Sequence, residues 1–116
     1  MLTTYGSTTL HTRPVTVWPG DCPSELLVLT EPDAEKISDI AGQPDVALGG
    51  SSPDGWWSAE GTAVVDQDAT ATALSAAGLP SQRRLAVVRI TLSRLREWTV
   101  TGRGPWDNTY AERTFA

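Results

Sequence analysis

The stretch from residue 85 to residue 100, LAVVRITLSRLREWTV, offers more periodic apolar surface than any other part of the chain, so the fold must be built around it. Val88, Ile90 and Leu92 occupy alternate positions, with polar residues between them. This period of two is typical of a strand that buries one face and exposes the other. Since β-branched and aliphatic side chains also favour strands, we predict that these three residues share one buried face of a sheet.

The alternation fails after Leu92, because Leu92, Leu95 and Trp98 follow one another at intervals of three. A spacing of three is typical of a helical turn, and Ser93 is a residue type that caps one. We therefore predict a strand to about Leu92, followed by a short helical turn. The alternative is one long strand with a bulge at residues 94–96, and either arrangement returns Trp98 to the core.

Short periodic segments separated by turn residues make up the rest of the chain. We expect an edge strand at 8–18, strands at 26–29 and 62–65, a brief strand at 46–48, and helices at 30–41 and 67–77. The first helix has the clearest limits. Thr30 and Asp33 have the spacing of a capping box, while Gly42 and Pro44 are typical of a helix end.

This order of elements predicts a single α+β domain over residues 1–116, with a small mixed or antiparallel sheet in one layer and two short helices in the other. The strand at 62, the helix at 67 and the strand at 85 would suit one right-handed crossover, so a small α/β sheet is the second choice. A chain of 116 residues is long enough to bury one core. Residues 101–116 are expected to form a C-terminal extension.

Charged residues are divided unevenly along the chain, although the net charge is only −5. Residues 1–68 carry eleven carboxylates against two cations, whereas residues 69–116 carry seven arginines against three carboxylates. If the halves separate in space, the molecule has an acidic side and a basic side. The alternative is that they interleave as ordinary surface ion pairs. The presence of eight arginines and one lysine also suggests a GC-rich bacterium or its phage as the source.

Several features favour a cytoplasmic protein without a membrane segment. No apolar run approaches the roughly 18 residues of a membrane span. The N-terminal residues lack the basic and apolar regions of a signal peptide. Cys22 is the only cysteine, so no internal disulfide can form and an oxidising compartment is not required.

Side chains suited to catalysis or metal binding are few. His11 is the only histidine, and no ligand spacing joins it to Cys22. The glycine–serine run at residues 49–52 has neither the lysine of a phosphate-binding loop nor the pattern around a nucleophilic serine. We therefore predict no catalytic residue, no metal and no cofactor, and an enzyme is the less favoured class.

Five tryptophans stand beside one phenylalanine and two tyrosines, which is an unusual aromatic balance. Trp18 and Trp98 are expected to fill the core. Trp56, Trp57 and Trp106 follow turn signals and are expected near the surface, where rigid aromatic rings anchor protein partners. Charge steers such association, so four carboxylates complete the predicted partner surface. They are Asp33, Glu35, Asp39 and Asp54.

Arg94, Arg96 and Arg103 lie near tryptophans and could contact an anion or single-stranded nucleic acid, but a pI of about 4.6 makes nucleic acid the weaker alternative. The leading hypothesis is a small non-enzymatic protein-binding protein of the inhibitor, immunity or antitoxin kind. Its partner would be a macromolecule, most readily another protein. A structural subunit, for example of a phage particle, is the alternative, and a homo-oligomer is compatible with either.

Overall fold

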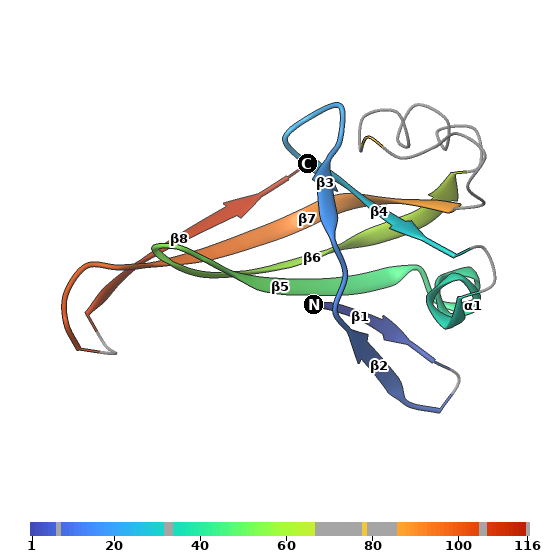
Figure 1. Ribbon diagram of the computed structural model, residues 1–116, viewed down its shortest axis with the longest axis horizontal. Helices are drawn as coiled ribbons and strands as arrows, with labels where there is room; N and C mark the ends of the chain where they lie inside the picture. The colour runs from blue at the N-terminus through green and yellow to red at the C-terminus, as the bar shows by residue number, and fades with distance from the viewer. Residues whose placement is uncertain (7, 32–33, 67–77, 79–85, 105–106, 116) are drawn as a thin grey trace.

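The computed structural model describes residues 1–6, 8–31, 34–66, 78, 86–104 and 107–115, and within them the chain forms eight strands and one helix (Figure 1). The elements in chain order are β1 (Leu2–Tyr5), β2 (Leu10–Arg13), β3 (Val17–Pro19), β4 (Glu25–Thr30), α1 (Glu35–Gly42), β5 (Asp45–Ser52), β6 (Gly55–Asp66), β7 (Ala86–Val100) and β8 (Asn108–Thr114). Every strand pairing is antiparallel. The strand order is β2-β1-β5-β6-β7-β4-β3, with β8 paired to β7.

Strand β7 is the centre of this sheet because it has neighbouring strands on both edges along most of its length. On one edge β6 pairs with it from residue 87 to residue 99. On the other edge β4 pairs with its first half and β8 with its second half. The change of partner coincides with a bulge, since Gly61 pairs with Leu92 and Glu60 with Arg94, which leaves Ser93 without an opposite residue on β6.

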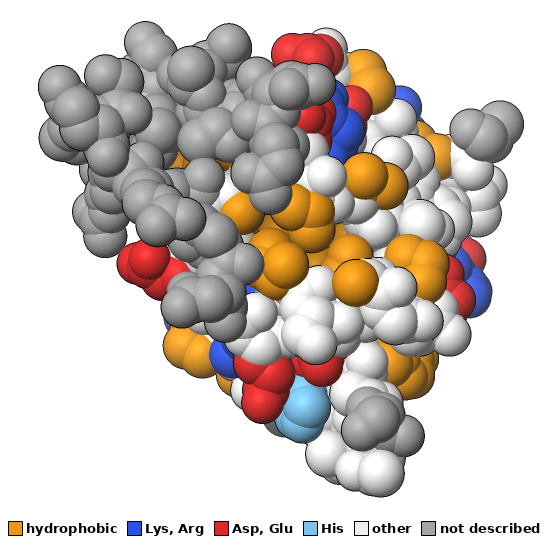
Figure 2. Space-filling view, turned by 90° about the vertical axis from the view of Figure 1, so that its right-hand side faces the viewer, with side chains coloured by type: hydrophobic (Ala, Val, Ile, Leu, Met, Phe, Trp, Pro, Cys, Tyr) orange, Lys and Arg blue, Asp and Glu red, His pale blue; other side chains and the backbone are white. Residues whose placement is uncertain are grey.

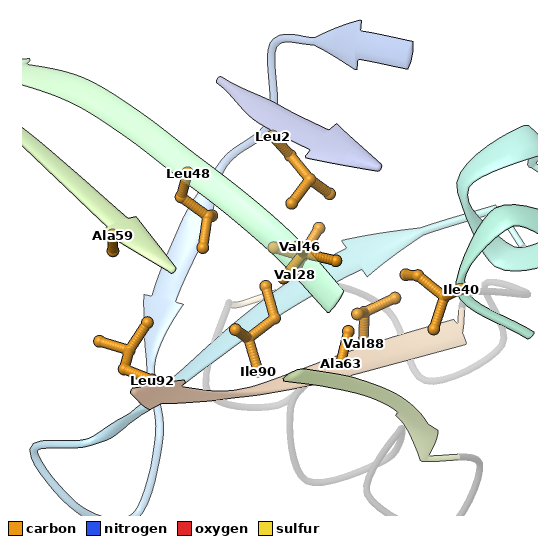
Figure 3. Packing of buried hydrophobic residues seen from close by; sticks show 10 residues of the cluster. All are labelled: Leu2, Val28, Ile40, Val46, Leu48, Ala59, Ala63, Val88, Ile90 and Leu92. Carbon is orange, nitrogen blue, oxygen red and sulfur yellow. The ribbon is translucent and has the colours of Figure 1, made fainter. Parts of the chain in front are cut away.

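The sheet curls around one hydrophobic core. Leu2 of β1 and Val28 of β4 are both fully buried in the same cluster, although three strands separate β1 from β4 in the sheet. Such strands can share a core only if the sheet bends back on itself. Figure 3 shows side chains from β1, β4, β5, β6 and β7 pointing toward one another, with Ile40 of α1 closing one end.

The prediction of a shared buried face on β7 is confirmed. Val88 and Ile90 have no exposed surface, and Leu92 is 4% exposed. The helical turn predicted after Leu92 is wrong, because the strand continues to Val100. The long bulged strand was the better alternative, with the extra residue at Ser93, just before the expected range.

The predicted α+β class, with two layers and two short helices, is wrong, and so is the α/β alternative. Strands β6 and β7 are antiparallel, whereas a crossover through a helix would have made them parallel. The sheet is also larger than predicted, since β5 covers residues 45–52 and β6 covers 55–66, where only two brief strands were expected. The second predicted helix, at 67–77, lies outside the described residues.

Helix α1 is shorter than predicted. It begins at Glu35 instead of following Thr30, which is the last residue of β4. Ala34 at the N-cap makes no side-chain capping hydrogen bond, so the predicted capping box does not start this helix. Gly42 is still helical, and Gln43 ends the helix by donating its backbone N–H to the carbonyl of Asp39.

The acidic and basic halves of the chain meet in ion pairs at several places. Arg89 of β7 lies between Glu25 and Asp66, and its Nη2 is 3.1 Å from the Asp66 carboxylate. These neighbours raise the pKa of Arg89, first through the hydrogen bond with Asp66. Among the described residues, no helix has the length and apolar character needed to cross a membrane.

Candidate functional site

An apolar groove opens beside the second half of β7, and we call it the Trp groove. Its volume is about 310 Å³. Aromatic and aliphatic side chains form most of its wall, with three polar residues among them. The lining residues are Val17, Pro23, Leu26, Ser52, Trp56, Trp57, Leu92, Leu95, Glu97, Trp98 and Thr99.

The bulge at Ser93 determines which side chains of β7 reach this groove. Side chains alternate along a strand, so the bulge moves Leu95, Glu97 and Thr99 onto the face that carries Leu92. All four line the groove. Trp98, which this alternation places on the opposite face, lines the groove as well. Without the extra residue, Arg94 and Arg96 would share the face of Leu92 instead.

Trp57 is held against β5 by the absence of a side chain at Gly50. The two residues are cross-strand partners, and a Cβ added at Gly50 would lie 2.9 Å from the indole Nε1 of Trp57. Glycine therefore lets the half-buried indole pack flat over the neighbouring strand. This position makes Trp57 an aromatic wall of the groove.

Three aromatic rings follow one another across β6, β7 and β8, and we call them the aromatic row. Trp56 stacks on Trp98 with 6.2 Å between ring centroids and 18° between planes. Trp98 in turn contacts Tyr110, with 5.3 Å between centroids. Trp56 is 41% exposed and Tyr110 is 50% exposed, so the row borders the groove with aromatic surface that remains in contact with solvent.

Two of the three arginines predicted to contact an anion lie beside carboxylates of the protein. Arg94 is paired with Glu112 of β8, which raises the pKa of Arg94 and lowers that of Glu112. Arg96 has its Nη2 3.9 Å from Glu60. Arg103 is exposed in the segment between β7 and β8. Two of the three therefore have carboxylate partners within the protein.

A second group of polar residues lies at the other end of the molecule, and we call it the His11 cluster. It consists of Thr4, His11, Arg13, Glu35 and Asp39. His11 Nδ1 lies 2.7 Å from Asp39 Oδ2 and 3.3 Å from Glu35 Oε1. Arg13 Nη2 lies 3.1 Å from the same Glu35 oxygen and 3.5 Å from Asp39 Oδ2. Figure 2 shows the only histidine, in pale blue, beside acidic side chains in red.

Asp39 is the buried carboxylate of this cluster, with 8% of its side chain exposed. Its pKa is lowered from the ordinary value of 3.8, first by the hydrogen bond from His11 and then by the one from Thr4, while burial acts in the opposite direction. Because Nδ1 of His11 faces two carboxylates, this geometry places a proton on Nδ1. A cavity of about 360 Å³, lined by His11, Glu35 and Asp39 among others, adjoins the cluster.

The predicted partner surface is dispersed over the fold. Trp56 and Trp57 border the Trp groove, and Asp54 is exposed in the turn before β6. Glu35 and Asp39 lie in the His11 cluster, far along the sheet from that turn. Trp106 and Asp33 lie outside the described residues. A macromolecular partner therefore stays a prediction.

Sequence reasoning missed the groove residues of β7 and the acid–base geometry around His11. The groove residues of β7 could have been found from the alternate positions of Leu95, Glu97 and Thr99, which continue the face of Leu92 once Ser93 is taken as a bulge. For the acid–base geometry, Glu35 and Asp39 are four residues apart and so lie on one face of a helix. Nothing in the spacing indicated that His11 would face them.

Comparison with known proteins shows the fold through solved structures alone. No family model matches the chain, and no curated protein matches it. General stress protein 26 from Bacillus anthracis aligns over 83% of this chain and 80% of its own, with a TM-score of 0.66 and 22% identity. The chain shares its fold.

Two further structures match over nearly the whole chain. One is a pyridoxamine 5′-phosphate oxidase-related, FMN binding protein from Nostoc punctiforme, with a TM-score of 0.65 and 11% identity over 99% of this chain and 85% of its own. The other is PhzG from Burkholderia lata, in complex with tetrahydrophenazine-1-carboxylic acid, with a TM-score of 0.68 and 12% identity over 97% of this chain and 80% of its own.

These likenesses correct the function predicted from the sequence. A non-enzymatic inhibitor, immunity or antitoxin-like protein was expected, with a phage or other assembly subunit as the alternative. The fold is instead the one found in proteins related to pyridoxamine 5′-phosphate oxidase, among them an FMN binding protein. Trp56 and Trp57, which were expected to contact a protein partner, line a groove of the size of a small-molecule site.

Proposed function

We propose that this chain is a flavin-binding protein of an oxidoreductase type, and that the flavin ring binds in the Trp groove. The observation that carries the proposal is the fold, which matches an FMN binding protein over 99% of this chain. A bound flavin supplies electron or hydride transfer, which the side chains of a protein cannot provide by themselves. A location in the cytoplasm, where FMN would be at hand, remains part of the proposal.

The lining of the Trp groove fits the ring system of a flavin. The ring is flat, with two apolar faces and a polar edge, and aromatic side chains pack well against such faces. Trp57 and Leu95 offer apolar surface, while Ser52 and Thr99 offer hydroxyl groups that could bind the polar edge. An apolar cavity of about 310 Å³ with a few polar groups is typical of a cofactor site.

The lining fits the phosphate of FMN less well. Among the described residues that line the groove there is no lysine or arginine, and Glu97 adds a carboxylate. Binding through the ring alone would make riboflavin nearly as good a ligand as FMN. We therefore expect the two dissociation constants to agree within about threefold, measured by equilibrium dialysis in the same buffer. A preference for FMN of a hundredfold would mean that cations outside the described lining hold the phosphate.

Removal of the indole of Trp57 tests where the ring binds. We expect Trp57→Ala to raise the dissociation constant for riboflavin about tenfold, since the loss of one aromatic packing surface is worth about 1.4 kcal/mol. Quenching of riboflavin fluorescence gives the dissociation constant. Trp18→Ala is the matched control, because Trp18 is half-buried but does not line the groove. This placement would be contradicted if both substitutions weakened riboflavin binding equally, or if neither weakened it.

A further inference from the structure

We propose that His11, Glu35 and Asp39 form a binding site for a divalent transition-metal ion of the zinc type, separate from the flavin groove. The donor atoms of the three side chains all lie within 4.8 Å of one another. One imidazole and two carboxylates form a ligand set that suits zinc and its neighbours in the transition series. The site goes beyond the proposed function and does not depend on it.

The three ligands come from two elements that the fold holds together. Glu35 and Asp39 are one turn apart on α1, so their carboxylates extend from the same face of the helix. His11 belongs to β2, where it pairs with Thr4 of β1. Its ring packs closely on Gly6, since a Cβ there would lie 2.5 Å from His11 Cε1. Glycine at this position therefore lets the imidazole lie close to the backbone of the β1–β2 turn.

The ion would take the place of the proton on His11 Nδ1. That nitrogen is already 2.7 Å from Asp39 Oδ2 and 3.3 Å from Glu35 Oε1. Donors around a zinc ion at about 2.0–2.2 Å lie about 3.3–3.5 Å from one another, so a small outward movement of Asp39 makes room for the metal. Thr4 donates its hydroxyl to Asp39 at 2.7 Å and so orients this ligand, as outer groups do in metal sites.

The charges of the cluster leave a negative excess for a cation to neutralise. With a neutral imidazole, the two carboxylates outnumber the single guanidinium of Arg13. Arg13 approaches the same two oxygens that the ion would use, so it competes with the metal. One of its nitrogens, Nη1, is buried without a hydrogen-bond partner among the described residues, so the cluster does not satisfy this guanidinium fully.

The adjoining cavity gives the proposed ion an open coordination position. It is lined by all three ligands together with Ser38 and Gln43, and its volume is about 360 Å³. Zinc sites with three protein ligands keep the fourth position for water or an exogenous molecule. The cavity on one side of the three donors provides that position.

Calorimetric titration of the full chain with zinc chloride tests the proposal. The chain is first treated with a chelator, and Cys22→Ser is included in every sample because the thiol of Cys22 is exposed and could bind zinc by itself. We expect one ion per chain. Glu35→Gln and His11→Gln should each weaken binding at least tenfold, and Arg13→Gln should tighten it several-fold by removing the competing cation.

The exposed position of Glu35 keeps the test decisive. Its side chain is 63% exposed, so Glu35→Gln is expected to leave the fold intact, which thermal unfolding by circular dichroism checks. Binding of less than one ion per chain at millimolar zinc would overturn the proposal. So would equal affinity of the Glu35→Gln variant and its parent. Tighter binding in the Arg13→Gln variant would support it specifically, because a site elsewhere on the surface has no reason to respond to that change.

Discussion

Gly61→Ala is expected to destabilise the protein by about 3 kcal/mol, as measured by urea unfolding. Gly61 is buried at the bulge between β6 and β7, and a Cβ there would lie 2.5 Å from the carbonyl oxygen of Thr91 and 3.2 Å from Ile90 Cγ2. Overpacking of this kind costs about 1–3 kcal/mol. We take the upper value because the nearest atom belongs to the backbone of the central strand, which cannot move without breaking its pairings.

Gly42→Ala is the matched control for this prediction. Gly42 is in the last turn of α1, and apart from its chain neighbours and the backbone of its own helix no atom lies within 4 Å of a Cβ placed there. Alanine favours a helix over glycine, so this variant should be as stable as the parent or more stable by about 0.5–1 kcal/mol. If both substitutions had the same effect, the close approach of β6 and β7 at Gly61 would be contradicted.

Asp39→Ala is expected to cost about 3 kcal/mol, because three donors lose a shared buried acceptor. Thr4 and His11 both bind Asp39 Oδ2 at 2.7 Å, and Arg13 lies 3.5 Å from it. Removing one partner of a buried, hydrogen-bonded charge leaves the others desolvated and unpaired. Glu35→Gln, at an exposed position of the same helix, should change stability by less than 1 kcal/mol.

The dependence of stability on pH gives a second measure of Asp39. Its pKa in the folded protein is below 3.8, chiefly because His11 donates a hydrogen bond to the carboxylate. The stabilisation from this group is therefore fully present above about pH 4 to 5 and is lost as the pH falls through the lower, folded value. Metal-free Asp39→Asn protein should lose less stability than the parent between pH 5 and pH 3. Parallel curves for the two proteins would contradict the lowered pKa.

The sequence allowed the central strand to be predicted, and the reason lies in its side chains. Val88, Ile90 and Leu92 alternate without interruption, and burial of that face requires no knowledge of the partners. The second half of β7 was mistaken for a helical turn because the alternation of apolar and polar residues stops at Ser93. A bulge and the start of a helix both end that alternation, so the sequence pattern does not distinguish them. A bulge is specified by the register with β6, which one strand alone does not contain.

The strands of the glycine-rich segment could not be predicted in the same way. β5 reads DVALGGSS, a composition more typical of a loop, and it is a strand because β1 and β6 pair with its two edges. Pairing of this kind overrides local propensity. The groove and the His11 cluster depend on such pairings as well. The β1–β2 register places His11 opposite Thr4, and Trp57 packs over Gly50, its partner on the neighbouring strand.

The most direct test of flavin binding in the Trp groove is the response of the tryptophan side chains to a flavin. Each indole gives a separate ¹H–¹⁵N resonance, and riboflavin can be added to the ¹⁵N-labelled protein in steps. We predict that the resonances of Trp57 and Trp98, which line the groove, shift and saturate together, while that of Trp18 stays in place. Unchanged positions for Trp57 and Trp98 at saturating riboflavin and at saturating FMN would contradict the account.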